Sequence, residues 1–286
     1  MRTITHTTPG AVELTLNLGP GWVRVIVEDR DTAEITLTPQ FDGDDVAAGL
    51  ITRSTVRHGE RDLTLTVPRP TASGITGRTV VQSSRGGVRV SQTNNVIRGN
   101  VTGLVITGDG DVYVSGARIT GSTTILDAGQ VRADVRLPIG SPLIVHTDDA
   151  DLHITGHLHS VVLTSTSGSL TADSIGALAA STSSGDVRAA SVTTANVKTM
   201  SGRVALDYTA AARVQTMSGS VDLVATTGTQ AEISTMSGDV RVTAYHDGHV
   251  GASTMSGDIV VDAVRGAQVT TSTRSMSGYV SVPRTR

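Results

Sequence analysis

The chain has 286 residues, a formal net charge of −3, 2% aromatic residues, 31 glycines and no cysteine. This length suffices for a sizeable core, and the lack of cysteine excludes disulfides, thiolate metal sites and a cysteine nucleophile. The small net charge argues against nucleic acid as a partner, and no apolar run is long enough to span a membrane. Because the first residues lack the apolar core of a secretory signal, a cytoplasmic location is expected.

Residues 1–70 are predicted to form a strand-rich N-terminal cap. Alternating apolar and polar residues predict strands, together with one short helical turn at 44–50; the strands are expected at 12–18, 22–25, 33–38 and 63–67. The phrase Gly-x-Val-Arg that begins at Gly21 also begins at Gly86 and Gly185, which indicates an early, divergent repeat unit. A cap is expected on physical grounds, because the first coil of an open stack would otherwise present unpaired backbone groups.

Residues 71–103, rich in Ser, Thr, Gly and Asn, are predicted to form irregular connecting coils, and residues 104–286 carry an internal repeat. Its period is 17 to 21 residues, and each of ten units has a small residue at its reference position: Gly110, Gly129, Ala150, Gly168, Gly185, Gly202, Gly219, Gly238, Gly257 and Gly278. The residues two and four positions later are apolar in every unit, and the residue between them is mostly polar. This alternation is typical of a half-buried strand.

Two all-β folds have this periodicity. One is a parallel β-solenoid (β-helix) of about ten 17–21-residue coils, in which stacked units share one core. The other is an antiparallel meander of hairpins. The solenoid is favoured because a two-residue hairpin prefers Asn-Gly or Asp-Gly at its turn, whereas these corners carry Ser-Gly followed by a variable residue. In this fold the aliphatic columns should be buried.

A column of carboxylates follows several reference glycines: Asp111, Asp151, Asp186, Asp239 and Asp258. Such a ladder raises the alternative of a β-helical enzyme that acts on a polysaccharide. However, other residue types interrupt the column, and no aromatic or basic platform accompanies it in the sequence. An Asp beside a glycine corner commonly accepts backbone N–H bonds, so we predict a structural role, with no catalytic residue and no cofactor.

The segment 146–159 gathers four of the eight histidines and three aspartates. His and carboxylate side chains can bind zinc or a similar ion. In the repeat register Asp151 and His153 point outward from one strand, but nothing supplies a third or fourth ligand. We therefore predict a solvated polar face and no metal site.

Every methionine except Met1 occupies one column of the repeat: Met200, Met217, Met236, Met255 and Met276. With strict alternation up to the corner, the flanking Thr faces inward and Met forms an exposed stripe, which suits an adaptable interface. If the corner inverts the alternation, Met fills the core instead. The sequence leaves both orientations open.

The repeated phrase Thr-x-Ser-Gly-Asp-Val, at 182–187, 235–240 and, with Ile in the last place, 254–259, resembles the DUF4097 proteins. These are bacterial chains with β-strand repeats that are described as adhesin-like. The opening residues 16–37 are also similar to the usual start of that family. The resemblance implies a β-helical fold and says little about activity.

The last predicted strand, 279–282, ends four residues before the C-terminus, so the final coil is expected to present a free edge. Either Pro283 and the nearby arginines blunt this edge, or it pairs with a second copy of the chain. The sequence thus predicts a non-catalytic scaffold or interaction protein, with a protein partner or a second copy and with neither nucleic acid nor membrane. Its possible interface comprises the five column methionines with Val280 and Val282.

Overall fold

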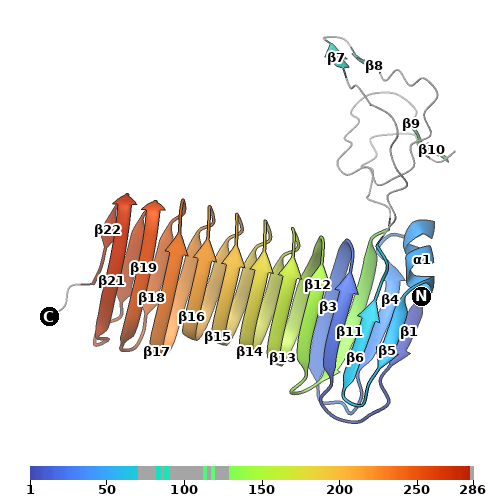
Figure 1. Cartoon of the computed structure of the whole chain (residues 1–286), viewed down its shortest axis with the longest axis horizontal. Helices are drawn as coiled ribbons and strands as arrows, with labels where there is room; N and C mark the ends of the chain where they lie inside the picture. The colour runs from blue at the N-terminus through green and yellow to red at the C-terminus, as the bar shows by residue number, and fades with distance from the viewer. Residues whose placement is uncertain (70–81, 85–86, 90–111, 115–116, 120–128, 284–286) are drawn as a thin grey trace.

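Successive repeat units pair as parallel strands in register. The computed structural model describes residues 1–69, 82–84, 87–89, 112–114, 117–119 and 129–283. Within them Val187 pairs with Val204, Val204 with Val221, Val221 with Val240 and Val240 with Ile259. The protein is therefore the predicted all-β parallel solenoid and not the antiparallel meander (Figure 1).

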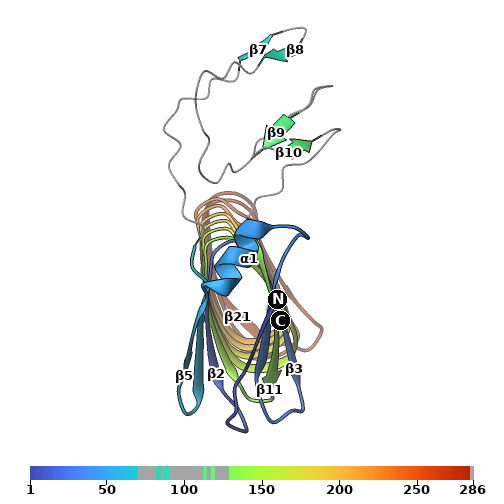
Figure 2. The ribbon, with the colours of Figure 1, turned by 90° about the vertical axis from the view of Figure 1, so that its right-hand side faces the viewer.

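The coils are flattened, so that each has two long sides (Figure 2). We call face 1 the side formed by β11, the first halves of β13 to β17, and then β18, β20 and β22; face 2 is formed by β12, the second halves of β13 to β17, and then β19 and β21. The strand bounds are β11 (Val131–Pro138), β12 (Pro142–Thr147), β13 (Ala150–Ser165), β14 (Leu170–Thr182), β15 (Val187–Thr199), β16 (Val204–Thr216), β17 (Val221–Thr235), β18 (Val240–Ala244), β19 (Gly248–Ser256), β20 (Ile259–Ala263), β21 (Val269–Ser277) and β22 (Val280–Ser281).

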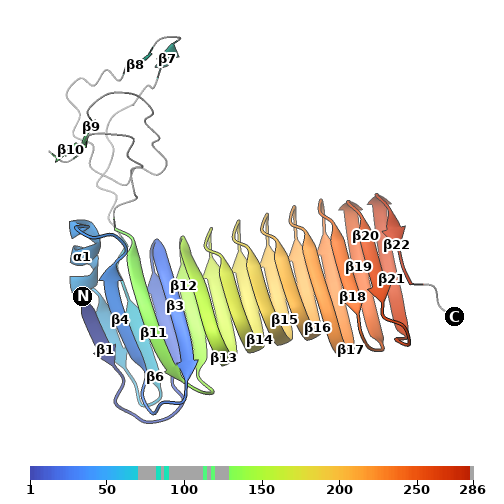
Figure 3. The same ribbon diagram turned by 180° about the vertical axis from the view of Figure 1, so that it is seen from behind.

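Two strands of the N-terminal segment lie inside the stack. This segment contains β1 (Arg2–Thr5), β2 (Glu13–Leu18), β3 (Gly21–Glu28), β4 (Glu34–Pro39), α1 (Asp45–Thr52), β5 (Thr55–His58) and β6 (Asp62–Thr66). On face 1, β3 is parallel to both β11 and β13 and lies between them (Figure 3). On face 2, β2 lies between β6 and β12. One turn of the solenoid is thus formed by β2 and β3, which precede the neighbouring strand β11 by about a hundred residues in the sequence.

The remaining N-terminal elements close that end of the stack. β4 is antiparallel to β11, β1 is antiparallel to β4, and β5 is antiparallel to β6. The helix expected as one short turn is the eight-residue α1, whose first turn is capped by the Asp44 carboxylate accepting the Ala47 N–H. The helix lies across this end of the coils (Figure 2), and its residues Ala47, Leu50 and Ile51 are buried in the core.

The predicted aliphatic columns form the core. From β11 to β20, the residues two and four positions after each reference residue are at most 4% exposed. The last unit differs, because Val280 and Val282 are 36% and 40% exposed. These two residues are the exceptions to the predicted burial, since the described chain places no coil beyond them.

The solenoid has about seven turns, fewer than the ten predicted units. The unit assigned to Gly110 contributes β9 (Val112–Val114), which pairs antiparallel with β10 (Ala117–Ile119) in a separate two-stranded sheet. The unit at Gly278 contributes only the two-residue β22. Of the predicted connecting coils 71–103, only β7 (Gln82–Ser84) and β8 (Gly87–Arg89), an antiparallel pair, fall within the described residues.

The reference glycines stack directly upon one another. A Cβ atom on Gly202 would overlap the carbonyl oxygen of Gly185, and one on Gly219 would overlap the carbonyl oxygen of Gly202. The same overlap recurs from Gly168 to Gly278. Glycine is therefore needed here for the close approach of neighbouring coils.

Candidate functional site

The five column methionines form one exposed line, which we call the methionine ridge: Met200, Met217, Met236, Met255 and Met276. Their side chains are 45–69% exposed. Hydrogen bonds keep the corners in register, since the Met200 carbonyl accepts the Ser218 N–H at 2.7 Å and the Met217 carbonyl accepts the Ser237 N–H at 2.7 Å. With about 4.8 Å between coils, the ridge is about 19 Å long. The sequence left open whether these methionines face the core or the solvent, and in the structure they face the solvent.

The flanking threonines point inward and bind the corner. Thr182, Thr199 and Thr216 are each 6% exposed. The Oγ1 atom of Thr199 accepts the Gly202 N–H at 3.0 Å, and that of Thr216 accepts the Gly219 N–H at 2.9 Å. Each corner is therefore closed by a local bond, and at Thr199 and Thr216 this bond holds the backbone of the adjacent methionine in place.

The corners nearer the C-terminus are built differently. Thr235 and Thr254 are also buried, yet their Oγ1 atoms have no hydrogen-bond partner within the described part of the chain. The Gly238 N–H instead donates to the Ser256 carbonyl at 3.1 Å, in the next coil. The glycine is thus satisfied without the threonine.

This difference predicts opposite outcomes for the same substitution at two corners. Thr199→Val should lower the free energy of unfolding by about 1–2 kcal/mol, because it leaves the buried Gly202 N–H without its acceptor. Thr235→Val should be neutral or slightly stabilising, because it removes a buried hydroxyl that has no partner. Chemical denaturation followed by circular dichroism measures both, and equal losses at the two sites would contradict the assigned bonds.

As predicted, the aspartates of the column accept hydrogen bonds from backbone N–H groups, but these N–H groups belong to the neighbouring coil. The Oδ1 atom of Asp186 accepts the Arg203 N–H at 2.8 Å, and that of Asp239 accepts the Asp258 N–H at 2.9 Å. Asp151 and Asp258 do the same for the next coil. The donor lies one coil further on, not in the same turn. Asp111 lies outside the described residues.

The segment 146–159 is spread along the coil surface. Asp151 and His153 share the outer side of face 1, whereas His157 lies at the bend between the faces, with its Nδ1 2.8 Å from the Ser174 Oγ. Among the residues that the structure describes, no three His, Cys, Asp or Glu side chains are grouped so as to hold a metal ion.

The last coil concentrates exposed apolar side chains. Met276 and Tyr279 are 69% and 67% exposed, and Val280 and Val282 follow directly. In the described chain, β21 pairs only with β19, and β22 pairs only with β20. Their outer edges therefore present backbone N–H and C=O groups beside apolar side chains.

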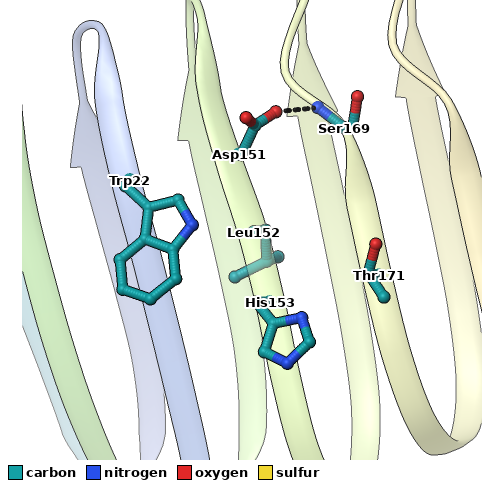
Figure 4. A pocket seen from close by; sticks show the side chains of 6 residues that line it. All are labelled: Trp22, Asp151, Leu152, His153, Ser169 and Thr171. Atoms are coloured by element: carbon teal, nitrogen blue, oxygen red, sulfur yellow. Dashed lines mark hydrogen bonds between the residues drawn. The ribbon is translucent and has the colours of Figure 1, made fainter.

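One feature was not predicted from the sequence: an aromatic residue stands beside the aspartate column. Trp22, the only tryptophan of the chain, lines a pocket of about 340 Å³ on face 1 together with Asp151, Leu152, His153, Ser169 and Thr171 (Figure 4). The guanidinium of Arg132 lies over the indole, 4.7 Å from the ring centroid. The expectation that no aromatic or basic group accompanies the column is therefore wrong at this coil. Trp22 comes from β3, and no sequence spacing indicates that β3 lies next to β13.

The family model described as Toastrack DUF4097 matches residues 55–286 of this chain. The chain belongs to the DUF4097 family. This agrees with the resemblance seen in the repeated Thr-x-Ser-Gly-Asp-Val phrase. The match begins at β5, so β2 and β3 lie outside it although they form a turn of the same solenoid.

Two solved structures that are similar to this DUF4097 chain have very low sequence identity to it. A "putative adhesin" from Parabacteroides merdae has a TM-score of 0.50 and 8% identity, over 99% of this chain and 96% of its own. A "putative adhesin" from Bacteroides fragilis has a TM-score of 0.47 and 11% identity, over 98% and 96%. At such identity the likeness concerns the fold alone. No curated protein matches the chain.

No helix in the described parts of this DUF4097 chain is long and apolar enough to span a membrane.

Proposed function

We propose that this DUF4097 protein is a non-catalytic interaction scaffold whose first partner is a second copy of the same chain, bound through the C-terminal end of the solenoid. The observation that supports this proposal is the exposure of core positions in the last coil. Ile259 and Val261 are 0% and 1% exposed, whereas Val280 and Val282, which occupy the same positions one unit later, are 36% and 40% exposed. Apolar surface of this kind gains free energy when a partner covers it.

The two ends of the solenoid differ, and the difference predicts the form of the assembly. At the N-terminal end α1 buries Leu50 and Ile51, and the Arg2 guanidinium donates to the Ser54 Oγ at 2.7 Å, which joins β1 to the segment that follows the helix. Only the C-terminal end of the described chain exposes core side chains. Contact between two such ends is two-fold and closed, so we expect a dimer and not a fibre.

The methionine ridge extends this surface along the side of the rod. Met276 belongs to both, because it is the last ridge residue and lies in the last coil. Thioether side chains are flexible and polarisable, so a row of them adapts to another protein surface better than to a small molecule. We propose the ridge as the lateral contact surface for a protein partner. The cytoplasmic location and the exclusion of nucleic-acid and membrane partners stay predictions from the sequence.

Sedimentation velocity tests the end-to-end dimer over protein concentrations from about 1 to 100 µM, a range in which weak dimers dissociate. We expect the mean mass of the intact chain to rise toward that of a dimer. Val280→Lys should raise the dissociation constant at least about tenfold, because it places a charge in the contact. Val162→Lys is the matched control, since Val162 is 39% exposed but lies on face 2 far from the end.

Oxidation footprinting locates the contact. Under mild peroxide, peptide mapping should show protection of Met276 in the dimer while Met200 and Met217 oxidise as in the monomer. Uniform protection along the ridge would place the contact on the side and overturn the end-to-end dimer. A mass that stays monomeric at every concentration would overturn self-association altogether.

A further inference from the structure

We propose that the pocket beside Trp22 is a binding subsite for one pyranose unit of a saccharide. This inference goes beyond the proposed scaffold role and concerns the opposite end of the molecule. Its walls come from three coils: the indole from β3, Asp151 and His153 from β13, and Ser169 and Thr171 from the next coil (Figure 4).

The indole wall is held in place before any ligand binds. The Arg132 guanidinium, 4.7 Å from the centroid of the indole ring, is itself fixed by Asp134, with Nε 2.8 Å from Oδ2 and Nη2 3.1 Å from Oδ1. The hydrogen bonds to Asp134 raise the pKa of Arg132, so the guanidinium stays cationic. An aromatic side chain that already has a packing partner loses less entropy when a ligand binds.

The strands next to the indole offer hydrogen-bonding groups at regular spacing. The Oδ1 atom of Asp151 is occupied by the Ser169 N–H at 2.9 Å, which orients the carboxylate. Its Oδ2 atom accepts no hydrogen bond from the described residues and remains an acceptor for a ligand. His153 and the exposed Thr171 add a donor and acceptor each. The backbone positions that carry these groups are about 4.8 Å apart on neighbouring strands and about 6.6 Å apart at alternate residues, so the groups lie within reach of one hexose ring.

This combination favours a neutral sugar over other ligands. A pyranose presents C–H groups to an aromatic wall and hydroxyl groups to a carboxylate, an imidazole and a hydroxyl. The carboxylate at the pocket disfavours phosphates and other anions. A volume of about 340 Å³ accommodates one sugar unit.

The lining also argues for binding without cleavage. Glycoside hydrolysis ordinarily needs two carboxyl groups on either side of the bond. Among the described residues that line this pocket, Asp151 is the one carboxylate, and one of its oxygens is used by the backbone. The subsite is therefore a recognition site.

Because Trp22 is the single tryptophan, its fluorescence reports on this pocket directly. The probes are cellohexaose, maltohexaose and chitohexaose, each titrated to about 10 mM, since one subsite implies weak, millimolar binding. We expect a saturable change with at least one of them. Asp151→Asn keeps an acceptor for the Ser169 N–H but removes the charge, and His153→Ala removes the second contact; each should weaken binding about tenfold.

Asp239→Asn is the matched control, because Asp239 makes the same bond to the next coil but has no tryptophan beside it. It should bind like the intact chain, and so should Val280→Lys, which separates this site from the proposed dimer. Circular dichroism establishes that each variant is folded. No saturable change with any of the three sugars, equal weakening in Asp239→Asn, or a response to inorganic phosphate instead of sugar would each overturn the proposal.

Discussion

Replacing Gly202 by alanine is expected to lower the free energy of unfolding by about 3 kcal/mol or more, the range of severe overpacking in a closed site. The added Cβ would overlap the Gly185 carbonyl oxygen and lie 3.0 Å from the Thr199 Oγ1. Neither neighbour can move freely, because one is backbone of the adjacent coil and the other holds the corner. Chemical denaturation followed by circular dichroism measures the loss.

Gly49→Ala is the control for this substitution. Gly49 lies within α1, and a Cβ there meets nothing within 4 Å. Alanine should therefore stabilise the helix by about 1 kcal/mol, since glycine is a poor helix former. A Gly202→Ala protein that unfolds at the same denaturant concentration as the intact chain would show that the coils can separate at the corner, contrary to the stacked-glycine geometry.

Replacing Val25 by aspartate is expected to cost about 5 kcal/mol or more and to prevent stable folding of the stack. Val25 is 0% exposed and pairs with Val135 on one side and Ile154 on the other. A carboxylate there would be buried without a partner, which is among the most costly single changes in a protein. Far-ultraviolet circular dichroism and protease resistance report the outcome.

The adjacent residue provides the control. Arg24 is on the same strand but exposed, so Arg24→Gln should change the free energy of unfolding by no more than about 0.5 kcal/mol. If Val25→Asp affected only a detachable N-terminal segment, the strands from β14 onward would keep their protease resistance. That result would contradict the position of β3 inside the stack.

Short-range patterns predicted most of the repeat region correctly. The apolar positions that follow each reference residue, such as Val187 and Val204, face the core because alternation in a strand has a period of two. The glycine at each corner indicated where coils meet. The same reasoning predicted that Asp186 and Asp239 accept backbone N–H groups. The donors, however, lie in the next coil. The spacing of residues within one repeat unit does not reveal this.

Two features depended on local geometry that residue types do not determine. From the sequence, the corner methionines could face either the core or the solvent. In the structure they face the solvent, because Thr199 points inward and accepts the Gly202 N–H. The number of coils was overestimated because the unit at Gly110 has the repeat pattern but pairs within its own hairpin, β9 and β10. Apolar and polar residues alternate in the same way in a strand of the solenoid and in a strand of a separate hairpin, so the sequence does not distinguish them.

The sequence by itself determined the all-β class, the period of the repeat and its buried columns, and it favoured the parallel solenoid, because alternation and small residues at regular corners set these features. Only the tertiary structure decided that β3 lies between β11 and β13, and hence that Trp22 lies beside Asp151. The reason is physical: parallel strands pair through their backbones, so any strand with the right alternation fits any place in the stack. Which place it takes depends on contacts between segments more than a hundred residues apart, and these leave no periodic trace in the sequence.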